Sequence, residues 1–191
     1  MKTIKNNVKS ELIIKNSRFI TLLIKITTKD EVNKILNNIK DEYPKATHYC
    51  YGYIVDNYKK SSDDKEPSNT AGIPTLNILE KENLTNILAV TIRYFGGIKL
   101  GVGGLIRAYS KSVQEALTKT DLVELKKAKL VEITINYDMQ KQLDYLLKDE
   151  TIIEKSFDSN ITYNVLIEDT NLEKLNNYDY KIIKDSTIEK S

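Results

Sequence analysis

The sequence is poor in the residue types that build cross-linked or metal-centred sites. Its 191 residues include one cysteine, one histidine, three prolines and no tryptophan. A lone cysteine, Cys50, excludes an internal disulfide and a multi-cysteine metal site. We therefore expect a protein of a reducing compartment that holds no metal and needs no cofactor.

Long hydrophobic runs are also missing. No uncharged apolar stretch approaches the roughly 20 residues that span a membrane. Lys2, Lys5 and Lys9 occupy the N-terminal region, where a signal peptide would be apolar. We expect no membrane contact and a cytoplasmic location. Apolar residues make up 40% of the chain and charged residues 29%, which is enough for a folded core.

Charge is nearly balanced overall but unevenly distributed. The net charge is +2, with 29 basic and 27 acidic residues, and only three of the basic residues are arginine. Residues 1–125 carry a net charge of +5 and residues 126–191 one of −3. The change of sign predicts two modules with different partners. Neither module is basic enough to indicate nucleic-acid binding from charge alone.

Hydrophobic periodicity predicts alternating strands and helices in residues 1–125. Strands are expected at Val8–Ile14, Phe19–Ile26, Thr47–Val55 and Ile87–Tyr94. Helices are expected after the Thr28/Glu31 capping box, at Ile73–Lys81 and from about Leu105 to Thr118. The polar segment Asp56–Thr70 is predicted to be a loop.

The second half has a more regular pattern. Strands are expected at Lys129–Ile135, Ile152–Phe157, Ile161–Ile167 and near Tyr180–Ile183, with helices at Met139–Leu147 and Leu172–Leu175. This βαββαβ order is typical of a small ferredoxin-like module. The sequence therefore predicts an α+β protein of two domains, residues 1–125 and 126–191.

The glycines gather in one segment that also holds two of the three arginines. Five of the seven glycines are Gly96, Gly97, Gly101, Gly103 and Gly104. Arg93 and Arg107 flank them, and Lys99 lies between them. A glycine loop between a strand and a helix lets the backbone approach a ligand, and the first helix amides bind anions. The three cations would add charge-assisted contacts to phosphate.

Other interpretations of this segment remain open. It matches neither the Walker loop nor the dinucleotide fingerprint. The glycines are equally consistent with a tight strand-to-helix crossing that binds nothing. Arg93 is also consistent with a structural ion pair to an acidic neighbour.

A second polar segment precedes it. Asp63, Asp64 and Glu66, followed by Ser68 and Thr70, are suited to hold a hard cation such as Mg²⁺ or to supply an acid/base pair. The acids are equally suited to pair with Arg93 or Arg107, and the hydroxyls to cap the next helix. Because the spacing is irregular, a structural loop is favoured over a metal site.

The Tyr-rich strand carries the remaining chemistry. Strand alternation places His48 and Cys50 side by side on one face, and Tyr49, Tyr51 and Tyr53 on the other. A buried thiol and a hydrogen-bonded histidine are favoured over a nucleophilic pair. The tyrosines are predicted to be half-buried, with base stacking as the alternative.

Residues 63–74 and 93–109 together resemble the signature of the Impact/YigZ family. Its pattern is Asp-Asp-Gly-Glu-Pro-Ser-Gly-Thr-Ala-Gly-x-Pro, followed by Thr-Arg-Tyr-Phe-Gly-Gly-x-x-Leu-Gly-x-Gly-Gly-Leu-x-Arg-Ala-Tyr. Lys65 and Asn69 replace two glycines of the first motif, and Ile92 replaces the threonine that opens the second. Asparagine tolerates a left-handed backbone more easily than lysine does. His48 also fits the family pattern.

The resemblance covers essentially the whole chain and implies a fold and a function. It implies an N-terminal β-α sandwich similar to domain IV of elongation factor G and to a ribosomal-protein domain. It also implies a C-terminal ferredoxin-like domain similar to domain V of that factor. Bacterial members are thought to bind nucleic acid or act at the ribosome. Eukaryotic relatives regulate translation by occupying the activator protein of a starvation-sensing kinase.

Our leading hypothesis is a non-enzymatic, RNA- or ribosome-associated translation regulator that contacts backbone phosphates through the glycine segment. One alternative is an enzyme acting on a phosphorylated small molecule or peptide, with His48 or Glu66 as acid/base and an anion held at Gly101–Gly104. Another is a pure protein-interaction module, which would show an exposed apolar patch.

Overall fold

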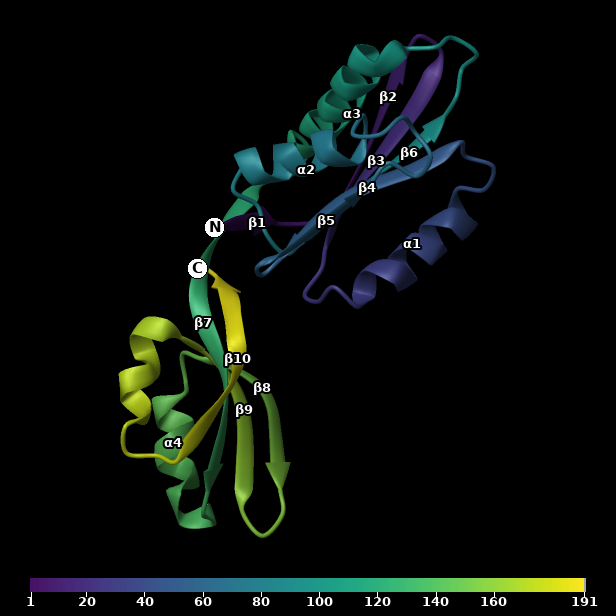
Figure 1. The fold of residues 1–191 in the computed structure, drawn as a ribbon. Coiled ribbons are helices and arrows are strands. Elements are labelled where there is room, and N and C mark those ends of the chain that lie inside the picture. Colours follow the sequence, from purple (N-terminus) through teal and green to yellow (C-terminus); the bar gives the residue numbers. More distant parts are fainter. Residues whose placement is uncertain (191) are drawn as a thin grey trace. The chain divides into compact units, whose positions relative to one another are not determined.

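A computed structural model describes residues 1–190, which form two compact α/β units, residues 1–123 and 124–190 (Figure 1). The first unit contains β1 (Lys2–Ile4), β2 (Val8–Ile14), β3 (Ser17–Lys25), α1 (Glu31–Glu42), β4 (His48–Val55), β5 (Tyr58–Ser62), α2 (Gly72–Lys81), β6 (Ile87–Tyr94) and α3 (Gly101–Leu117). The second contains most of β7 (Leu122–Ile135), then η1 (Tyr137–Met139), α4 (Gln140–Leu146), β8 (Thr151–Phe157), β9 (Ile161–Glu168), η2 (Asp169–Leu175) and β10 (Tyr180–Glu189).

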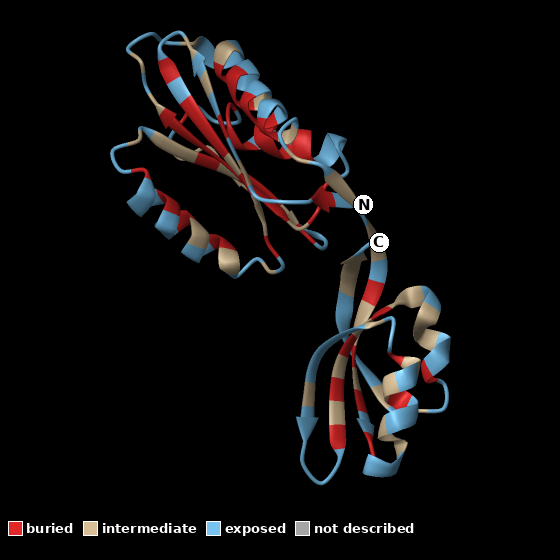
Figure 2. Cartoon of the chain, turned by 180° about the vertical axis from the view of Figure 1, so that it is seen from behind, coloured by how far each residue is buried: buried red, intermediate tan, exposed pale blue. Residues whose placement is uncertain are grey.

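The first unit is an antiparallel sheet covered on both faces. Its strand order is β2-β3-β6-β4-β5, with α1 on one face and α2 and α3 on the other (Figure 1). Leu88, Val90 and Ile92 of β6 belong to the core that includes Leu36 and Ile39 of α1. Because both faces are covered, seven of the eight β6 residues are buried, and the strand is red along nearly all its length in Figure 2.

The face under α2 and α3 positions the residues discussed below. Leu105, Ala108 and Tyr109 of α3 pack against Phe19 of β3 and Cys50 of β4. The rings of Phe19 and Tyr109 meet edge to face with centroids 5.3 Å apart. The start of α3 is therefore held firmly over β3 and β4. The three strand tyrosines pack against the α1 core on the opposite face; Tyr49 and Tyr51 are half-buried as predicted, whereas Tyr53 is buried in that core.

One predicted loop is partly wrong. Tyr58–Ser62, inside the segment predicted as a loop, forms edge strand β5 paired with β4. The first three of its residues are exposed, so no apolar alternation marks the strand, and polar lysines are common on sheet edges.

The start of α3 also differs from the prediction. The helix begins at Gly101, four residues before Leu105, so three of the five clustered glycines lie in its first turn. The amides of a first turn have no intrahelical partner, and glycine costs less there than in the helix interior. Only Gly96 and Gly97 remain in the connection from β6 to α3.

The second unit follows the predicted βαββαβ order. Its sheet is antiparallel in the order β10-β7-β9-β8, and its helical segments contribute Leu143, Leu147 and Leu175 to one core. The second helical segment is a 3₁₀ helix, and β7 and β10 are longer than predicted. Within residues 1–190 no helix is long and apolar enough to cross a membrane.

The two glycines of the connection predict different mutational costs. A Cβ on Gly96 would lie 2.0 Å from the carbonyl carbon of Asn16, whereas one on Gly97 would meet no atom within 4 Å. Gly97 has φ +85°, so alanine there is strained only by its backbone. We expect Gly96→Ala to lower the free energy of unfolding by about 3 kcal/mol or more and Gly97→Ala by about 1 kcal/mol.

Urea denaturation of the two variants measures both costs. Equal losses would contradict the close approach of the β6–α3 connection to the turn between β2 and β3.

Candidate functional site

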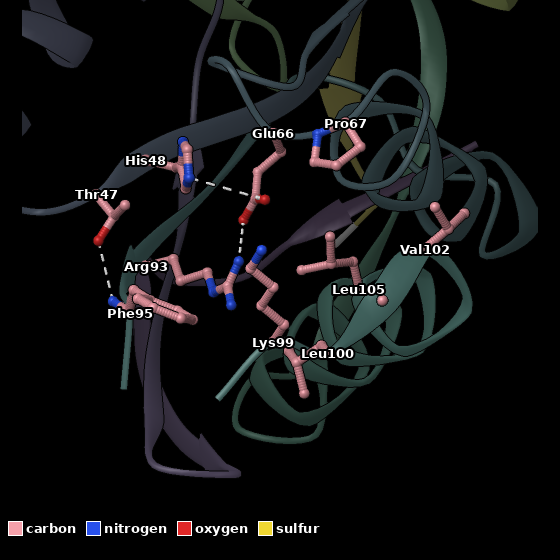
Figure 3. Close-up of a pocket in the computed structure, with 11 residues that line it drawn as sticks. Thr47, His48, Glu66, Pro67, Arg93, Phe95, Lys99, Leu100, Val102 and Leu105 are labelled. Atoms are coloured by element: carbon pink, nitrogen blue, oxygen red, sulfur yellow. Dashed lines mark hydrogen bonds and ion pairs between the residues drawn. The ribbon is translucent and has the colours of Figure 1, made fainter. Parts of the chain in front are cut away.

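A cleft of about 450 Å³ lies where the start of α3 meets β4, β6 and the loop of residues 63–70, called the acidic loop below (Figure 3). His48, Glu66 and Arg93 form its polar floor. Apolar side chains form its walls, and Lys99 lies at its rim; the wall residues are Pro67, Phe95, Leu100, Val102 and Leu105. Residues from three separate sequence motifs therefore converge on one concave site.

The floor is built on a buried ion pair. Arg93 is 4% exposed, and its guanidinium donates to Oε1 of Glu66 at 2.5 Å. The Tyr109 hydroxyl donates to the same oxygen at 2.8 Å. The guanidinium carbon of Arg93 lies 5.4 Å from the ring centroids of both Phe19 and Phe95. Arg93 is thus the structural ion pair considered above, and its charge is not free for a phosphate.

His48 is held next to this pair. Its Nδ1 lies 2.7 Å from the carbonyl oxygen of Asp64, which only accepts, so Nδ1 is the nitrogen that carries a hydrogen. Its Nε2 lies 3.7 Å from Oε2 of Glu66, the carboxylate oxygen that Arg93 leaves unused. Figure 3 shows both contacts of Glu66 converging at the floor.

Cys50 does not act as a nucleophile in this arrangement. Its Sγ lies 3.0 Å from the Asp63 carbonyl oxygen and 3.3 Å from the Tyr109 hydroxyl oxygen, so its single hydrogen has two acceptors within reach. Burial raises the pKa of the Cys50 thiol well above its ordinary value, so the thiol stays neutral. The buried thiol favoured from the sequence is therefore observed.

Asp63 and Asp64 of the loop accept hydrogen bonds from backbone amides. Asp63 accepts hydrogen bonds from the amides of Asn69, Ala71 and Gly72 at 2.8–2.9 Å. Asp64 accepts from the Tyr49 amide at 2.7 Å. Within residues 1–190 no three His, Cys, Asp or Glu side chains are placed to share a metal ion. Both carboxylates instead hold the loop against β4 and the start of α2.

Asp63 therefore caps the start of α2, a role that the sequence analysis offered to the Ser68 and Thr70 hydroxyls. Thr70 donates its hydroxyl to the Pro67 carbonyl at 2.6 Å and does not cap α2. Ser68 is exposed on the loop and does not cap α2 either. Burial alone would raise the pKa of Asp63, but the Gly72, Ala71 and Asn69 amides lower it below its ordinary value.

Lys65 and Asn69, which replace two glycines of the family pattern, both have a left-handed backbone conformation. Lys65 has φ +70° and Asn69 has φ +62°. Both positions thus use the conformation that glycine adopts most easily. The loop therefore has a left-handed backbone at both positions, at a conformational cost that is greater for Lys65.

The rim carries free positive charge. Lys99 and Arg107 are exposed and have no acidic partner within the part of the chain that the structure describes. A Cβ on Gly101 would meet no atom within 4 Å, as at Gly97, so the backbone is open at these two glycines. A Cβ added to Gly103 would lie 3.4 Å from a guanidinium nitrogen of Arg107, so the Arg107 side chain lies over this glycine. Among the predicted cations, Lys99 and Arg107 are thus available and Arg93 is not.

Sequence reasoning missed an apolar element of this rim. Phe95, Ile98, Val102 and Ile106 are all exposed, and Val102 is 59% exposed. In the sequence they are apolar residues at the start of a helix or just before it, and such residues are usually buried in the core. The one sequence signal of their exposure was their position next to glycines. Glycine has no side chain, so it does not cover the apolar residues beside it.

The Asp63 contacts predict a pH-dependent stability. Asp63→Asn should lower the free energy of unfolding by about 1–2 kcal/mol at pH 7, because an amide oxygen accepts three backbone hydrogens less strongly than a carboxylate. Since the folded pKa is lowered, this contribution is present above the unfolded pKa of about 3.9 and is lost as the pH falls through the folded pKa. Urea denaturation from pH 7 downward should show wild type and variant converging. A constant difference would contradict the capping role.

The left-handed lysine predicts a stabilising substitution. Lys65→Gly should raise the free energy of unfolding by about 0.5 kcal/mol, since the relief of left-handed strain exceeds the added unfolded-state entropy. Lys60→Gly in β5 is the matched control and should destabilise. Thermal denaturation of both variants measures the contrast, and equal destabilisation would be inconsistent with strain at Lys65.

Comparison with known proteins identifies the family. Residues 15–117 match the sequence profile described as the Impact N-terminal domain. The chain is 37% identical over 172 residues to the IMPACT family member YvyE of Bacillus subtilis, covering 87% of this chain and 79% of that protein. It is 38% identical over 127 residues to the IMPACT family member YigZ of Escherichia coli, covering 64% and 61%.

A solved structure agrees over the full length. The crystal structure of a hypothetical protein superposes with a TM-score of 0.71 and 26% identity, covering 96% of this chain and 97% of that one. With the motif residues gathered around one cleft and the profile match spanning more than half of the chain, this protein is a member of the Impact family.

Proposed function

We propose that this protein is a non-enzymatic, RNA- or ribosome-associated regulator of translation that binds phosphate backbone at the start of α3. The observation that carries the proposal is the open first turn of α3 beside two exposed, unpaired cations, Lys99 and Arg107. Family membership supports it, because the resemblance implies translation-related roles. A cytoplasmic location is part of the same proposal.

Electrostatics supports an anionic ligand at this place. The first amides of a helix lack intrahelical partners, and the helix dipole puts partial positive charge there. In the first turn of α3 the residues carry no acidic side chain that would repel an anion. Exposed glycines let a phosphate approach those amides closely. Arg93 positions the site through Glu66 and does not itself contact the ligand.

The apolar rim is compatible with RNA. Phe95 is 46% exposed beside the glycine segment, and unstacked bases pack on aromatic side chains in single-stranded complexes. The same rim is the observation that favours a pure protein-interaction module as the second candidate. An apolar partner surface would be insensitive to salt, whereas phosphate contacts are strongly salt-dependent.

The domain assignment belongs to the same proposal. Residues 1–125 correspond to an Impact-type domain similar to domain IV of elongation factor G, and residues 126–191 to a ferredoxin-like domain. The strand order β10-β7-β9-β8 around one core supports the second assignment.

Charge reversal at the rim tests the proposal. Lys99→Glu should weaken binding of a single-stranded RNA oligonucleotide by about tenfold at moderate salt and make the plot of log K against log[salt] less steep by about one phosphate contact. The measurement is fluorescence anisotropy across a salt series. Lys111→Glu, an exposed lysine farther along the same helix, is the matched control because it changes the net charge equally.

The control should retain most of the wild-type affinity. Equal effects of the two charge reversals, or affinity indifferent to salt, would overturn the proposed site and favour the protein-interaction module.

A further inference from the structure

The floor of the cleft contains two hydrogen-bond acceptors that face each other. Nδ1 of His48 faces the Asp64 carbonyl and donates to it, so in the neutral form of the imidazole Nε2 is the nitrogen that carries the lone pair. Oε2 of Glu66 lies 3.7 Å from that nitrogen. This distance is too long for a direct hydrogen bond and short enough for one donor group to reach both atoms.

The remaining contacts of Glu66 leave Oε2 as the acceptor that faces the cleft. Oε1 already receives the Arg93 guanidinium and the Tyr109 hydroxyl. Within residues 1–190, the hydrogen bonds of Glu66 go to Oε1, and the contact of Oε2 is the one with Nε2 of His48. The Glu66 side chain is 4% exposed, and a buried carboxylate oxygen is costly when it lacks a donor.

The group that satisfies both acceptors must bring two hydrogens. A hydroxyl has a single donor hydrogen and satisfies only one of them. An amino group satisfies both at once. An alkyl ammonium would add a positive charge next to Arg93 and unpaired Lys99, which disfavours it. A neutral amino group attached to an anionic molecule suits the charges of the cleft better.

The walls and the size of the cleft define the rest of the ligand. Apolar side chains such as Pro67, Leu100 and Leu105 suit a flat, poorly charged ring system. The volume of about 450 Å³ lies in the usual range for small-ligand sites. Lys99 and the first turn of α3 line the same cleft, and an attached phosphate would be bound there.

We propose that the cleft binds the amino-bearing base of a nucleotide, whose exocyclic amine donates to Glu66 Oε2 and His48 Nε2 while its phosphate contacts the start of α3. Adenine, cytosine and guanine carry this amine and uracil does not. The inference rests on the proposed function for the phosphate contact and adds base selection to it. The nucleotide is part of an RNA strand or free in solution.

The single histidine of the chain makes this cleft directly observable by NMR. Titration of the full-length protein with AMP, CMP and UMP compares bases on the same 5′-phosphate. AMP and CMP should bind at least about tenfold more tightly than UMP, because uracil has a single N3–H donor and leaves at least one of the two acceptors unpaired. They should also shift the Nε2 resonance of His48, and UMP should shift it much less. Equal affinity of AMP, CMP and UMP, or an Nε2 signal unmoved by AMP, overturns the inference.

A variant separates base selection from phosphate binding. His48→Phe keeps a planar side chain but removes one acceptor, so AMP should lose its advantage over UMP while UMP affinity stays unchanged. A retained preference in this variant would exclude His48 as the selecting group. Should the variant fail to fold, the wild-type titration still decides the matter.

Oligonucleotides distinguish the two sources of the base and the two proposals. Six-residue oligo(A) binding more tightly than both AMP and oligo(U) assigns the site to RNA. AMP binding with base preference but without any gain for oligo(A) supports the inference and contradicts the RNA function. Salt-dependent RNA binding without preference between oligo(A) and oligo(U) supports the RNA function and contradicts the inference.

Discussion

The buried ion pair between Arg93 and Glu66 is the interaction on which the candidate site depends. It joins a central strand of the sheet to the acidic loop, and Tyr109 of α3 donates to the same carboxylate. Three elements that are distant in sequence are thereby fixed around one oxygen atom. Removal of one partner from a buried pair typically costs about 3–5 kcal/mol, since the other charge is left uncompensated. The two residues therefore determine where the cleft floor lies.

The charged residues of the two motifs have two different roles. Arg93 and Asp63 are engaged internally, one by Glu66 and the other by three backbone amides. Lys99 and Arg107 lie at an open helix start and are left for a ligand. Glu66 has both functions, because one carboxylate oxygen holds Arg93 while the other faces His48. The paired charges thus fix the structure around the cleft, and the unpaired ones lie on its surface.

The sequence predicted those parts of the fold that have local signals. The range of β6, the faces of β4 and the order of elements in the second unit all follow from periodicity and turn residues. β5 was missed because an edge strand of polar residues has no apolar alternation. The start of α3 was placed too late because glycine normally marks a loop, whereas its low cost in a first turn allowed the helix to begin at Gly101.

The site was predicted as a set of residues but not as an arrangement. The sequence singled out both Glu66 and Arg93, yet left several partners open for each, because they are 27 residues apart and only the sheet brings them together. The left-handed backbone of Lys65 was foreseeable only through the family glycine that it replaces. The exposure of Val102 and Ile106 depends on how α3 lies on the sheet, which periodicity does not specify.

The central claim is that the start of α3 is the surface that meets an anionic partner. Backbone amide shift mapping with a short single-stranded RNA at low salt tests this claim most directly. The account predicts that the largest shifts fall on residues 97–104 and on the residues of the cleft floor. Shifts that leave this segment unchanged and fall instead on the strands of residues 124–190 would contradict it.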